Sequence, residues 1–170
     1  MTNSCAVSLG SNQGNSISIL KDVLSQFKRD KIFKVDLISS LYLTEPVDTF
    51  PQPYFFNLVA SGKTTLEPFS LLSYFKAIER DFGRKRKRDK GERTIDIDIL
   101  FYDSLIIKSN LLTIPHPALM TRRCVLIPLK EISPYFQHPE TKMTISRMVS
   151  SIGEKGEIKH LGSLFPEMNY

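Results

Sequence analysis

Residues 94–101, Thr-Ile-Asp-Ile-Asp-Ile-Leu-Phe, alternate between apolar and acidic side chains in a stretch rich in β-branched residues. This composition favours a β-strand, in which successive side chains point to opposite faces. Asp96 and Asp98 then share one face, and the three isoleucines share the other. The segment is therefore predicted to be a strand that buries isoleucine against a core and presents two carboxylates on its opposite side.

Two carboxylates at positions i and i+2 of a strand lie roughly 6 to 7 Å apart, because the chain rises about 3.3 Å per residue. At an effective dielectric constant of about 20, this separation costs on the order of 2 to 3 kcal/mol of electrostatic repulsion. Hard carboxylate oxygens suit Mg²⁺, especially when a polyphosphate completes the coordination. Asp96 and Asp98 are therefore candidate Mg²⁺ ligands. The alternative is that they only keep a solvent-facing side of the strand polar, which is the commoner role of an isolated Asp-x-Asp pair.

Residues 83–93, immediately before this strand, concentrate the positive charge of the chain. They contain seven Lys or Arg residues and two acids, a net of +5 (7 − 2), and the whole chain, with 23 basic and 18 acidic residues, is also +5. A polyanion is the natural partner of such a segment. Next to two carboxylates, it favours a site for a metal–polyphosphate, and hence phosphoryl-type chemistry on a nucleotide. A nucleic-acid patch and an ordinary solvated loop are the alternatives.

Length and composition indicate one soluble domain spanning residues 1–170. The apolar content of 41% and the charged content of 24% are ordinary for a globular protein. Cys5 and Cys124 are too few for a disulfide framework, so a reducing, cytoplasmic environment is expected. The sequence shows no signal peptide and no transmembrane helix, and we expect a monomer without a membrane partner.

The pattern of apolar residues predicts an alternating order of strands and helices. Strands are expected at 5–9, within 32–43, at 55–63 and at 94–101, with a short one at 105–107. Helices are expected at 16–29 with a cap at Asn15 or Ser16, from Pro68 to Phe82, at 125–132 with an interruption at Pro128, and at 145–152, plus a helical turn at 118–122. This order is that of a ferredoxin-like α+β sandwich (βαββαβ) with an antiparallel sheet and extra C-terminal helices. One face of the sheet would pack on helices, and the other would be free to carry Asp96 and Asp98.

Several stretches resemble one known family in the expected order along nearly the whole chain. They are Ser8-Leu9-Gly10-Ser11-Asn12, Tyr42-Leu43-Thr44-Glu45-Pro46-Val47, Arg93-Thr94-Ile95-Asp96-Ile97-Asp98-Ile99-Leu100 and Ile114-Pro115-His116-Pro117. On these residues the chain resembles the 6-hydroxymethyl-7,8-dihydropterin pyrophosphokinases of folate biosynthesis. It has neither a P-loop motif nor a Gly-x-Gly-x-x-Gly motif, so it is not similar to P-loop enzymes or typical protein kinases.

The resemblance implies transfer of a pyrophosphoryl group from ATP to the hydroxymethyl oxygen of 6-hydroxymethyl-7,8-dihydropterin, with release of AMP. It implies that Asp96 and Asp98 bind two Mg²⁺ ions and that Arg84 and Arg93 stabilise charge on the transferring group. The positions that match the ATP site are Glu79, Arg84, Arg93, Ile99, Leu112, Thr113, His116 and Arg122. Those that match the pterin site are Thr44, Glu45, Val47, Phe55, Asn57 and Cys124, with Asn57 facing the donor–acceptor edge of the ring.

The chain departs from the family pattern where an aromatic residue and Gly-Pro often precede the loop arginine. Here Lys90-Gly91-Glu92 stand at those positions, and Cys124 takes the place of an aromatic residue that stacks on the pterin. Loss of one stacking face costs about 0.5 to 1.5 kcal/mol beyond the buried area. We therefore predict weaker pterin binding rather than lost function. The glycines at both ends of the basic segment predict a loop that closes over ATP.

Two other functional classes fit part of the sequence. A ferredoxin-like RNA-binding module would use the basic segment, but the chain lacks the aromatic signature of that class, and this role leaves Asp96 and Asp98 unexplained. A pterin or nucleotide binder without turnover is the third possibility, because of Lys90 and Cys124. His138 and His160 have no partners at metal-ligand spacing and are interpreted as surface or structural residues.

Overall fold

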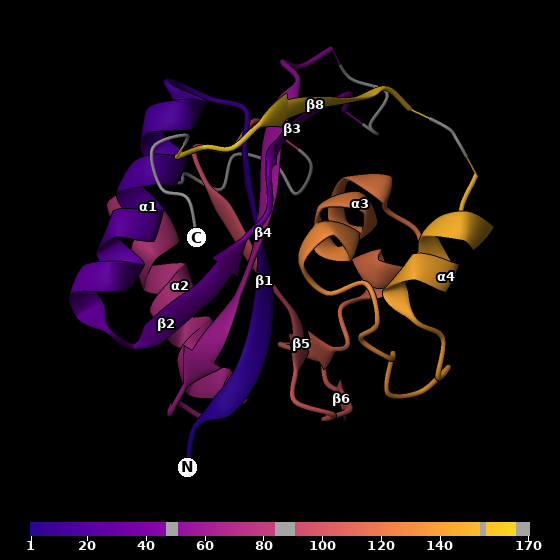
Figure 1. The fold of residues 1–170 in the computed structure, drawn as a ribbon. Helices are drawn as coiled ribbons and strands as arrows, with labels where there is room; N and C mark the ends of the chain where they lie inside the picture. The colour runs from indigo at the N-terminus through magenta and orange to yellow at the C-terminus, as the bar shows by residue number, and fades with distance from the viewer. Residues whose placement is uncertain (47–50, 84–90, 154–155, 166–170) are drawn as a thin grey trace.

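A computed structural model describes residues 1–46, 51–83, 91–153 and 156–165, and its centre is a six-stranded antiparallel sheet (Figure 1). The strands of this sheet are β1 (Asn3–Ser11), β2 (Phe33–Ile38), β3 (Leu41–Thr44), β4 (Phe55–Thr64), β5 (Asp96–Tyr102) and β8 (Ile158–Gly162). The helices are α1 (Ser16–Asp30), α2 (Pro68–Asp81), α3 (Arg123–Ile132) and α4 (Ile145–Ser151), with a short 3-10 helix at Pro117–Met120. A separate two-stranded hairpin pairs β6 (Ile107–Lys108) with β7 (Thr113–Ile114).

The order of the strands confirms the predicted ferredoxin-like arrangement. The sheet runs β5-β1-β4, and both β2 and β3 pair with β4. The β-prone stretch at 32–43 forms two strands, β2 and β3, which are separated by Ser39 and Ser40. The Ser39 Oγ accepts a hydrogen bond from Val59 N at 2.9 Å, which holds the break against β4.

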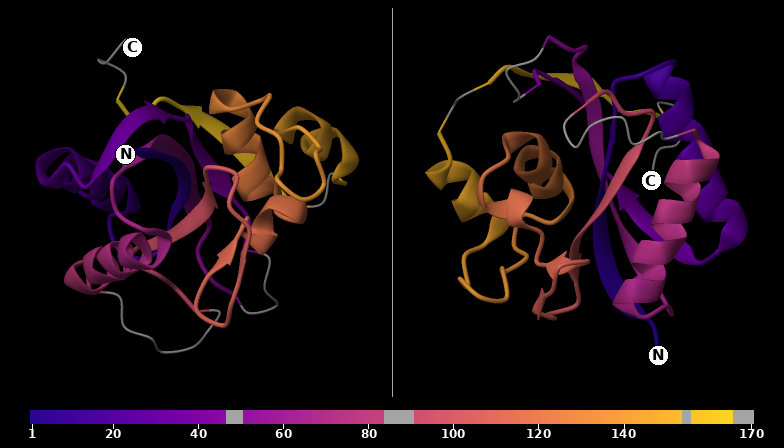
Figure 2. Two further views of the ribbon diagram at one scale, coloured as in Figure 1. Left: turned by 90° about the horizontal axis from the view of Figure 1, so that it is seen from below. Right: turned by 180° about the vertical axis from the view of Figure 1, so that it is seen from behind.

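The two long helices lie together on one face of the sheet, as both views of the ribbon show (Figures 1 and 2). Asn15 caps α1 by accepting from Ser18 N, and Pro68 occupies the start of α2, where its fixed φ suits a helix. Both helices bury one apolar stripe, and Phe27 of α1 and Phe75 of α2 meet with ring centroids 5.5 Å apart. The stripes close the main core over the buried side of β1, β4 and β5.

The opposite face of the sheet is not free, and in this respect the prediction was wrong. The 3-10 helix, α3 and α4 cover one end of it and form a second core with Ala6 of β1, Val59 of β4 and Leu100 of β5 (Figure 2). The apolar side chains that this face carries at that end must be buried somewhere, and α3 supplies the cover. Only the other end, where the same strands carry polar residues, stays open.

Other elements differ from the prediction in detail. The α3 helix runs through Pro128 without interruption, although this proline lies in the helix interior and cannot donate a backbone hydrogen bond. The strands β7 and β8 were not predicted, since Thr113–Ile114 is very short and Ile158–Gly162 has little apolar pattern. Within the described ranges, no helix is both long and apolar enough to cross a membrane.

Candidate active site

Three neighbouring strands place their polar residues side by side at the open end of the second face. Gly10 of β1 lies opposite Asp96 of β5 on one side and opposite Asn57 of β4 on the other. Because directly opposed residues of antiparallel strands share a face, these three form one row across the sheet. The middle position of the row has no room for a side chain, because a Cβ at Gly10 would lie 2.9 Å from Asn57 Oδ1. In the next row, Ser8 lies opposite Asp98.

The carboxylates of Asp96 and Asp98 stand half-buried on this face, while Ile97 and Ile99 between and beside them are buried in the main core, as the alternation predicted. Burial raises the pKa of Asp98, and the nearby charge of Asp96 raises that pKa further. Positive charge from His116, Lys76 and Arg93 acts in the opposite direction. The guanidinium of Arg93 pairs with the Asp96 carboxylate. The pKa of Asp98 is thus raised even with three basic groups nearby.

A cavity of about 400 Å³ opens beside this row, and we call it the Asn57 cavity. The Asn57 Nδ2 donates to Thr44 Oγ1 at 2.6 Å, so the amide is oriented by β3. Phe56, between the two lining residues of β4, packs against the main core, as the alternation of side chains along a strand requires. The cavity is lined by Ser8, Gly10, Thr44, Glu45, Pro46, Phe55, Asn57, Gly91, Arg93, Asp96, Asp98, Arg122, Cys124 and Val125.

A second cavity of about 310 Å³, the His116 cavity, lies on the other side of Asp98. The His116 Nδ1 accepts from Ala118 N at 3.1 Å, and the backbone N of His116 donates to Leu100 O at 2.8 Å. These bonds fix the imidazole at the start of the 3-10 helix and leave its other ring nitrogen for a ligand. The lining residues are Leu72, Lys76, Asp98, Ile99, Ser109, Asn110, Leu111, Leu112, Thr113, His116 and Pro117. Asp98 lines both cavities.

Among the predicted site residues that the structure describes, Glu79 is the one that lines neither cavity. The residue is only 2% exposed, and its carboxylate accepts a hydrogen bond from the backbone N of Ile97 at 2.8 Å. It also pairs with Lys76 at 2.9 Å. Glu79 therefore satisfies a backbone donor of β5 on the side away from β1 and orients Lys76, rather than standing at the cavity surface.

Sequence reasoning missed Lys76, Ser8 and Gly10 as site residues. Lys76 lines the His116 cavity, and its spacing of one helical turn from Glu79 is the signal that could have found it. Ser8 and Gly10 follow from the same alternation that places Asp96 and Asp98, once β1 is paired with β5. Two predicted residues, Val47 and Arg84, lie outside the described residues, as does most of the basic segment.

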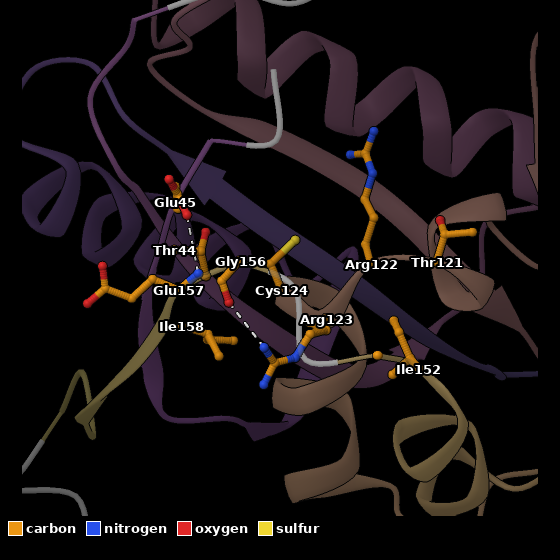
Figure 3. A pocket seen from close by; sticks show the side chains of 11 residues that line it. Thr44, Glu45, Thr121, Arg122, Arg123, Cys124, Ile152, Gly156, Glu157 and Ile158 are labelled. Atoms are coloured by element: carbon orange, nitrogen blue, oxygen red, sulfur yellow. Dashed lines mark hydrogen bonds between the residues drawn. The ribbon is translucent and has the colours of Figure 1, made fainter. Parts of the chain in front are cut away.

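A third cavity of about 530 Å³ adjoins the Asn57 cavity and shares Thr44, Glu45, Arg122 and Cys124 with it. Figure 3 shows its wall between the start of α3 and the strand β8, with Cys124 between the two sides. The Arg123 Nη1 donates to Gly156 O at 3.1 Å. Burial raises the pKa of the Cys124 thiol, so it is a neutral, small side chain at this boundary.

The carboxylate pair fits a Mg²⁺–polyphosphate better than a closed protein-only metal centre. In the described part of the chain, no group of three or more His, Cys, Asp or Glu side chains could hold a metal ion. Two aspartates supply two hard oxygen ligands, and Mg²⁺ sites commonly take one or two carboxylates and complete the shell with phosphate oxygens and water. Asp96 and Asp98 are the residues that would hold the ion.

Comparison with known proteins connects this site to a family. The model of the family 7,8-dihydro-6-hydroxymethylpterin-pyrophosphokinase (HPPK) matches residues 6–134, which include every residue that lines the Asn57 and His116 cavities. The chain belongs to the HPPK family. It is 35% identical over 153 residues to the 2-amino-4-hydroxy-6-hydroxymethyldihydropteridine pyrophosphokinase of Haemophilus influenzae, covering 90% of this chain and 95% of that protein.

Several other relatives are much longer than this chain, which spans about a fifth of their length. The chain is 37% identical over 156 residues to the folic acid synthesis protein FOL1 of Dictyostelium discoideum, covering 91% of this chain but 23% of that protein. In a crystal structure of Plasmodium falciparum HPPK-DHPS with pteroate, a region 19% identical in sequence superposes with a TM-score of 0.73, covering 88% of this chain and 42% of that one. That likeness confirms the fold.

Proposed function

We propose that residues 1–170 form a single HPPK domain that transfers pyrophosphate from ATP to the hydroxymethyl group of 6-hydroxymethyl-7,8-dihydropterin, with release of AMP. Membership of the HPPK family supports this activity. The observation that carries it is the position of Asp98, which lines both the Asn57 cavity and the His116 cavity. If the two substrates occupy the two cavities, a carboxylate at that boundary lies next to the groups that react with each other.

The Asn57 cavity is the proposed pterin site. A pterin edge carries alternating donors and acceptors, and the Asn57 amide, held by Thr44, offers one group of each kind. Phe55 supplies an aromatic wall, and Cys124 supplies a small apolar one. Glu45 lines the same cavity, and Val47 is assigned to it by the family resemblance alone.

The His116 cavity and the adjoining arginines are the proposed ATP site. His116 offers a hydrogen-bond donor to phosphate oxygens through its other ring nitrogen, and Lys76 offers donors and positive charge. Leu112, Thr113 and Ile99 line the same cavity and would contact the rest of the nucleotide.

Arg93 and Arg122 line the Asn57 cavity, where their guanidinium groups can follow the transferring phosphates towards the pterin. Arg84 is assigned the same role by resemblance alone.

We further propose that two Mg²⁺ ions bind to Asp96 and Asp98 together with the triphosphate. When bound, the metal neutralises phosphate charge and lowers the pKa of the attacking hydroxyl. The protein groups hold the reacting parts in place: Asn57 orients the pterin, and Arg93 offers charge to the transferring group. Closure of the cavities to water would protect ATP from hydrolysis.

The proposal includes a cytoplasmic monomer with no nucleic-acid and no membrane partner. Both cysteines are free, which fits a reducing compartment. A dimer in solution at micromolar concentration, measured by light scattering, would contradict the oligomeric part.

A nucleotide product assay with Mg–ATP and 6-hydroxymethyl-7,8-dihydropterin tests the function. We expect AMP that depends on the pterin, with no ADP. Pterin binding without AMP formation would contradict the proposed activity and indicate a non-catalytic pterin binder. Neither AMP nor pterin binding, with retention of RNA on the basic segment, would replace it by the nucleic-acid module.

A further inference from the structure

The turn that follows β1 carries a buried amide, Asn12, that joins two segments far apart in the sequence. Its side chain is 5% exposed. The Oδ1 accepts from the backbone N of Arg93 at 2.8 Å, and the Asn12 backbone N donates to Arg93 O at 3.0 Å. On the other side, Nδ2 donates to Gln52 Oε1 at 3.2 Å and to Pro53 O at 3.1 Å.

These partners determine which way the amide points. A backbone N–H can only donate and the Pro53 carbonyl can only accept, so Oδ1 must face Arg93 and Nδ2 must face the Gln52–Pro53 segment. Asparagine is the shortest side chain with an acceptor and two donor hydrogens at one end. An aspartate could keep the bond from Arg93 N but would turn an oxygen towards Pro53 O.

The two joined segments lead to two strands, β4 and β5, whose residues line the Asn57 cavity. Gln52 and Pro53 precede β4, whose Phe55 and Asn57 line the Asn57 cavity. Arg93 precedes β5, lines the same cavity and pairs with Asp96. A shift of either segment must therefore move the other or break a hydrogen bond to Asn12.

We propose that Asn12 is a positioning residue that couples pterin binding to the placement of Arg93 on the phosphates, and this inference rests on the proposed function. Asn12 lines neither the Asn57 cavity nor the His116 cavity, so it acts through the two segments that it joins. Pterin bound against β4 restricts the motion of Gln52 and Pro53. The hydrogen bonds of Asn12 to both segments then restrict the position of Arg93 as well. By thermodynamic linkage, the nucleotide must tighten pterin binding by the same factor. Loss of two neutral hydrogen bonds corresponds to a coupling factor of about tenfold.

The test uses calorimetric dissociation constants for a non-hydrolysable Mg–ATP analogue and for the pterin, each alone and in the presence of the other. The variants are Asn12→Asp, which keeps the bond from Arg93 N and loses both bonds to the Gln52–Pro53 segment, and Gln52→Ala, which loses one of them. Gln13→Ala is the matched control, because Gln13 is an exposed amide in the same turn.

In the wild type, we expect the pterin to tighten nucleotide binding about tenfold. Asn12→Asp should bring that factor to within about twofold of one, with nucleotide binding alone nearly unchanged. Gln52→Ala should give an intermediate factor, and Gln13→Ala the wild-type factor. A merely structural role would instead lower the melting temperature and weaken both ligands alike. Equal factors in wild type and Asn12→Asp, or no coupling in the wild type, would overturn the proposal.

Gln52→Ala keeps the test informative if Asn12→Asp fails to fold, because it leaves the turn and both hydrogen bonds between Asn12 and the Arg93 backbone in place. The binding measurements need no turnover. A wild type that couples the two ligands but forms no AMP would reject the proposed activity alone, whereas AMP formation without coupling would reject the role of Asn12 alone.

Discussion

The two faces of the central sheet are formed by the same strands, yet they differ in how far their apolar residues extend. On the α1 and α2 side, β1, β4 and β5 are apolar along their length, for example at Leu9 and Ile97. On the α3 side, the same strands are apolar at one end, as at Leu100, and polar at the other, as at Asp96. We call the α1 and α2 side the continuous face and the α3 side the divided face. The continuous face packs in the main core, and the candidate site lies on the divided face, where its apolar half ends.

The division also explains where stability and function lie. Apolar residues that are fully enclosed contribute about 25 cal/mol per Å² of buried surface. The polar half instead carries two neighbouring carboxylates and a raised pKa at Asp98, which cost stability. We therefore expect substitutions on neighbouring positions of β5 to have opposite effects on the free energy of unfolding.

The largest effect on stability is expected from Ile97→Ala, in the continuous face. Ile97 is fully buried, and removal of a large core side chain costs about 2 to 5 kcal/mol of unfolding free energy. Urea unfolding followed by circular dichroism measures it. A loss below about 1 kcal/mol would show that the main core tolerates a cavity next to the site and would break the comparison.

A smaller loss of unfolding free energy is expected from Glu131→Ala, which removes hydrogen bonds between α3 and the Ser40–Tyr42 segment of the sheet. The Glu131 carboxylate of α3 accepts from Ser40 N at 2.9 Å, from Ser40 Oγ at 2.8 Å and from Tyr42 Oη at 3.0 Å. Burial, followed by the hydrogen bond to Glu131, raises the pKa of Tyr42 to about 12. We expect a loss of about 1 to 3 kcal/mol in urea unfolding, because three hydrogen bonds to a charged group are removed. Glu131→Gln keeps an acceptor and should lose less; an equal loss in both variants would contradict this explanation.

A gain of stability is expected from Asp98→Asn in metal-free protein at neutral pH, on the order of 1 kcal/mol. The folded-state pKa of Asp98 is raised above its usual value of 3.8, so the unfolded chain loses this proton first as the pH rises. Folding stability therefore falls between pH 3.8 and the higher folded-state pKa. The substituted amide cannot ionise, so the gain should appear above this window and vanish below it. Melting temperatures measured in a chelator across acidic to neutral pH test this, and a lower melting temperature at neutral pH would contradict it.

The smallest effect is expected from Cys124→Phe at the boundary between the Asn57 cavity and the third cavity. An aromatic ring there adds a stacking face for the pterin, worth about 0.5 to 1.5 kcal/mol, or roughly a 2- to 12-fold lower dissociation constant. Fluorescence titration with the pterin in the presence of the Mg–ATP analogue measures it. Cys124→Ser is the size-matched control and should stay close to the wild type. Unchanged pterin affinity in Cys124→Phe would show that Cys124 does not limit stacking.

The sequence predicted the continuous face well, because strict alternation in β5 and the apolar stripes of α1 and α2 are local patterns. It also predicted that Asp96 and Asp98 share a face. It could not predict that α3 covers half of that face, because the cover depends on contacts between Val59 and residues about seventy positions later. The role of Glu79 under β5 was missed for the same reason, since an edge-strand N–H that needs a partner is visible only in three dimensions. In the sequence, Asn12 stands out only as the last residue of the Ser8–Asn12 stretch that resembles the family.

The measurement that most directly tests the central claim is the rate of AMP formation by Asp98→Asn with saturating Mg–ATP and pterin, compared with Asp36→Asn, an exposed carboxylate on β2. Since Asp98 borders both cavities, we predict that the rate falls at least about 100-fold while the fold remains intact. Asp36→Asn should match the wild type. A rate for Asp98→Asn within about threefold of the wild type would contradict the claim that the reaction takes place at this carboxylate.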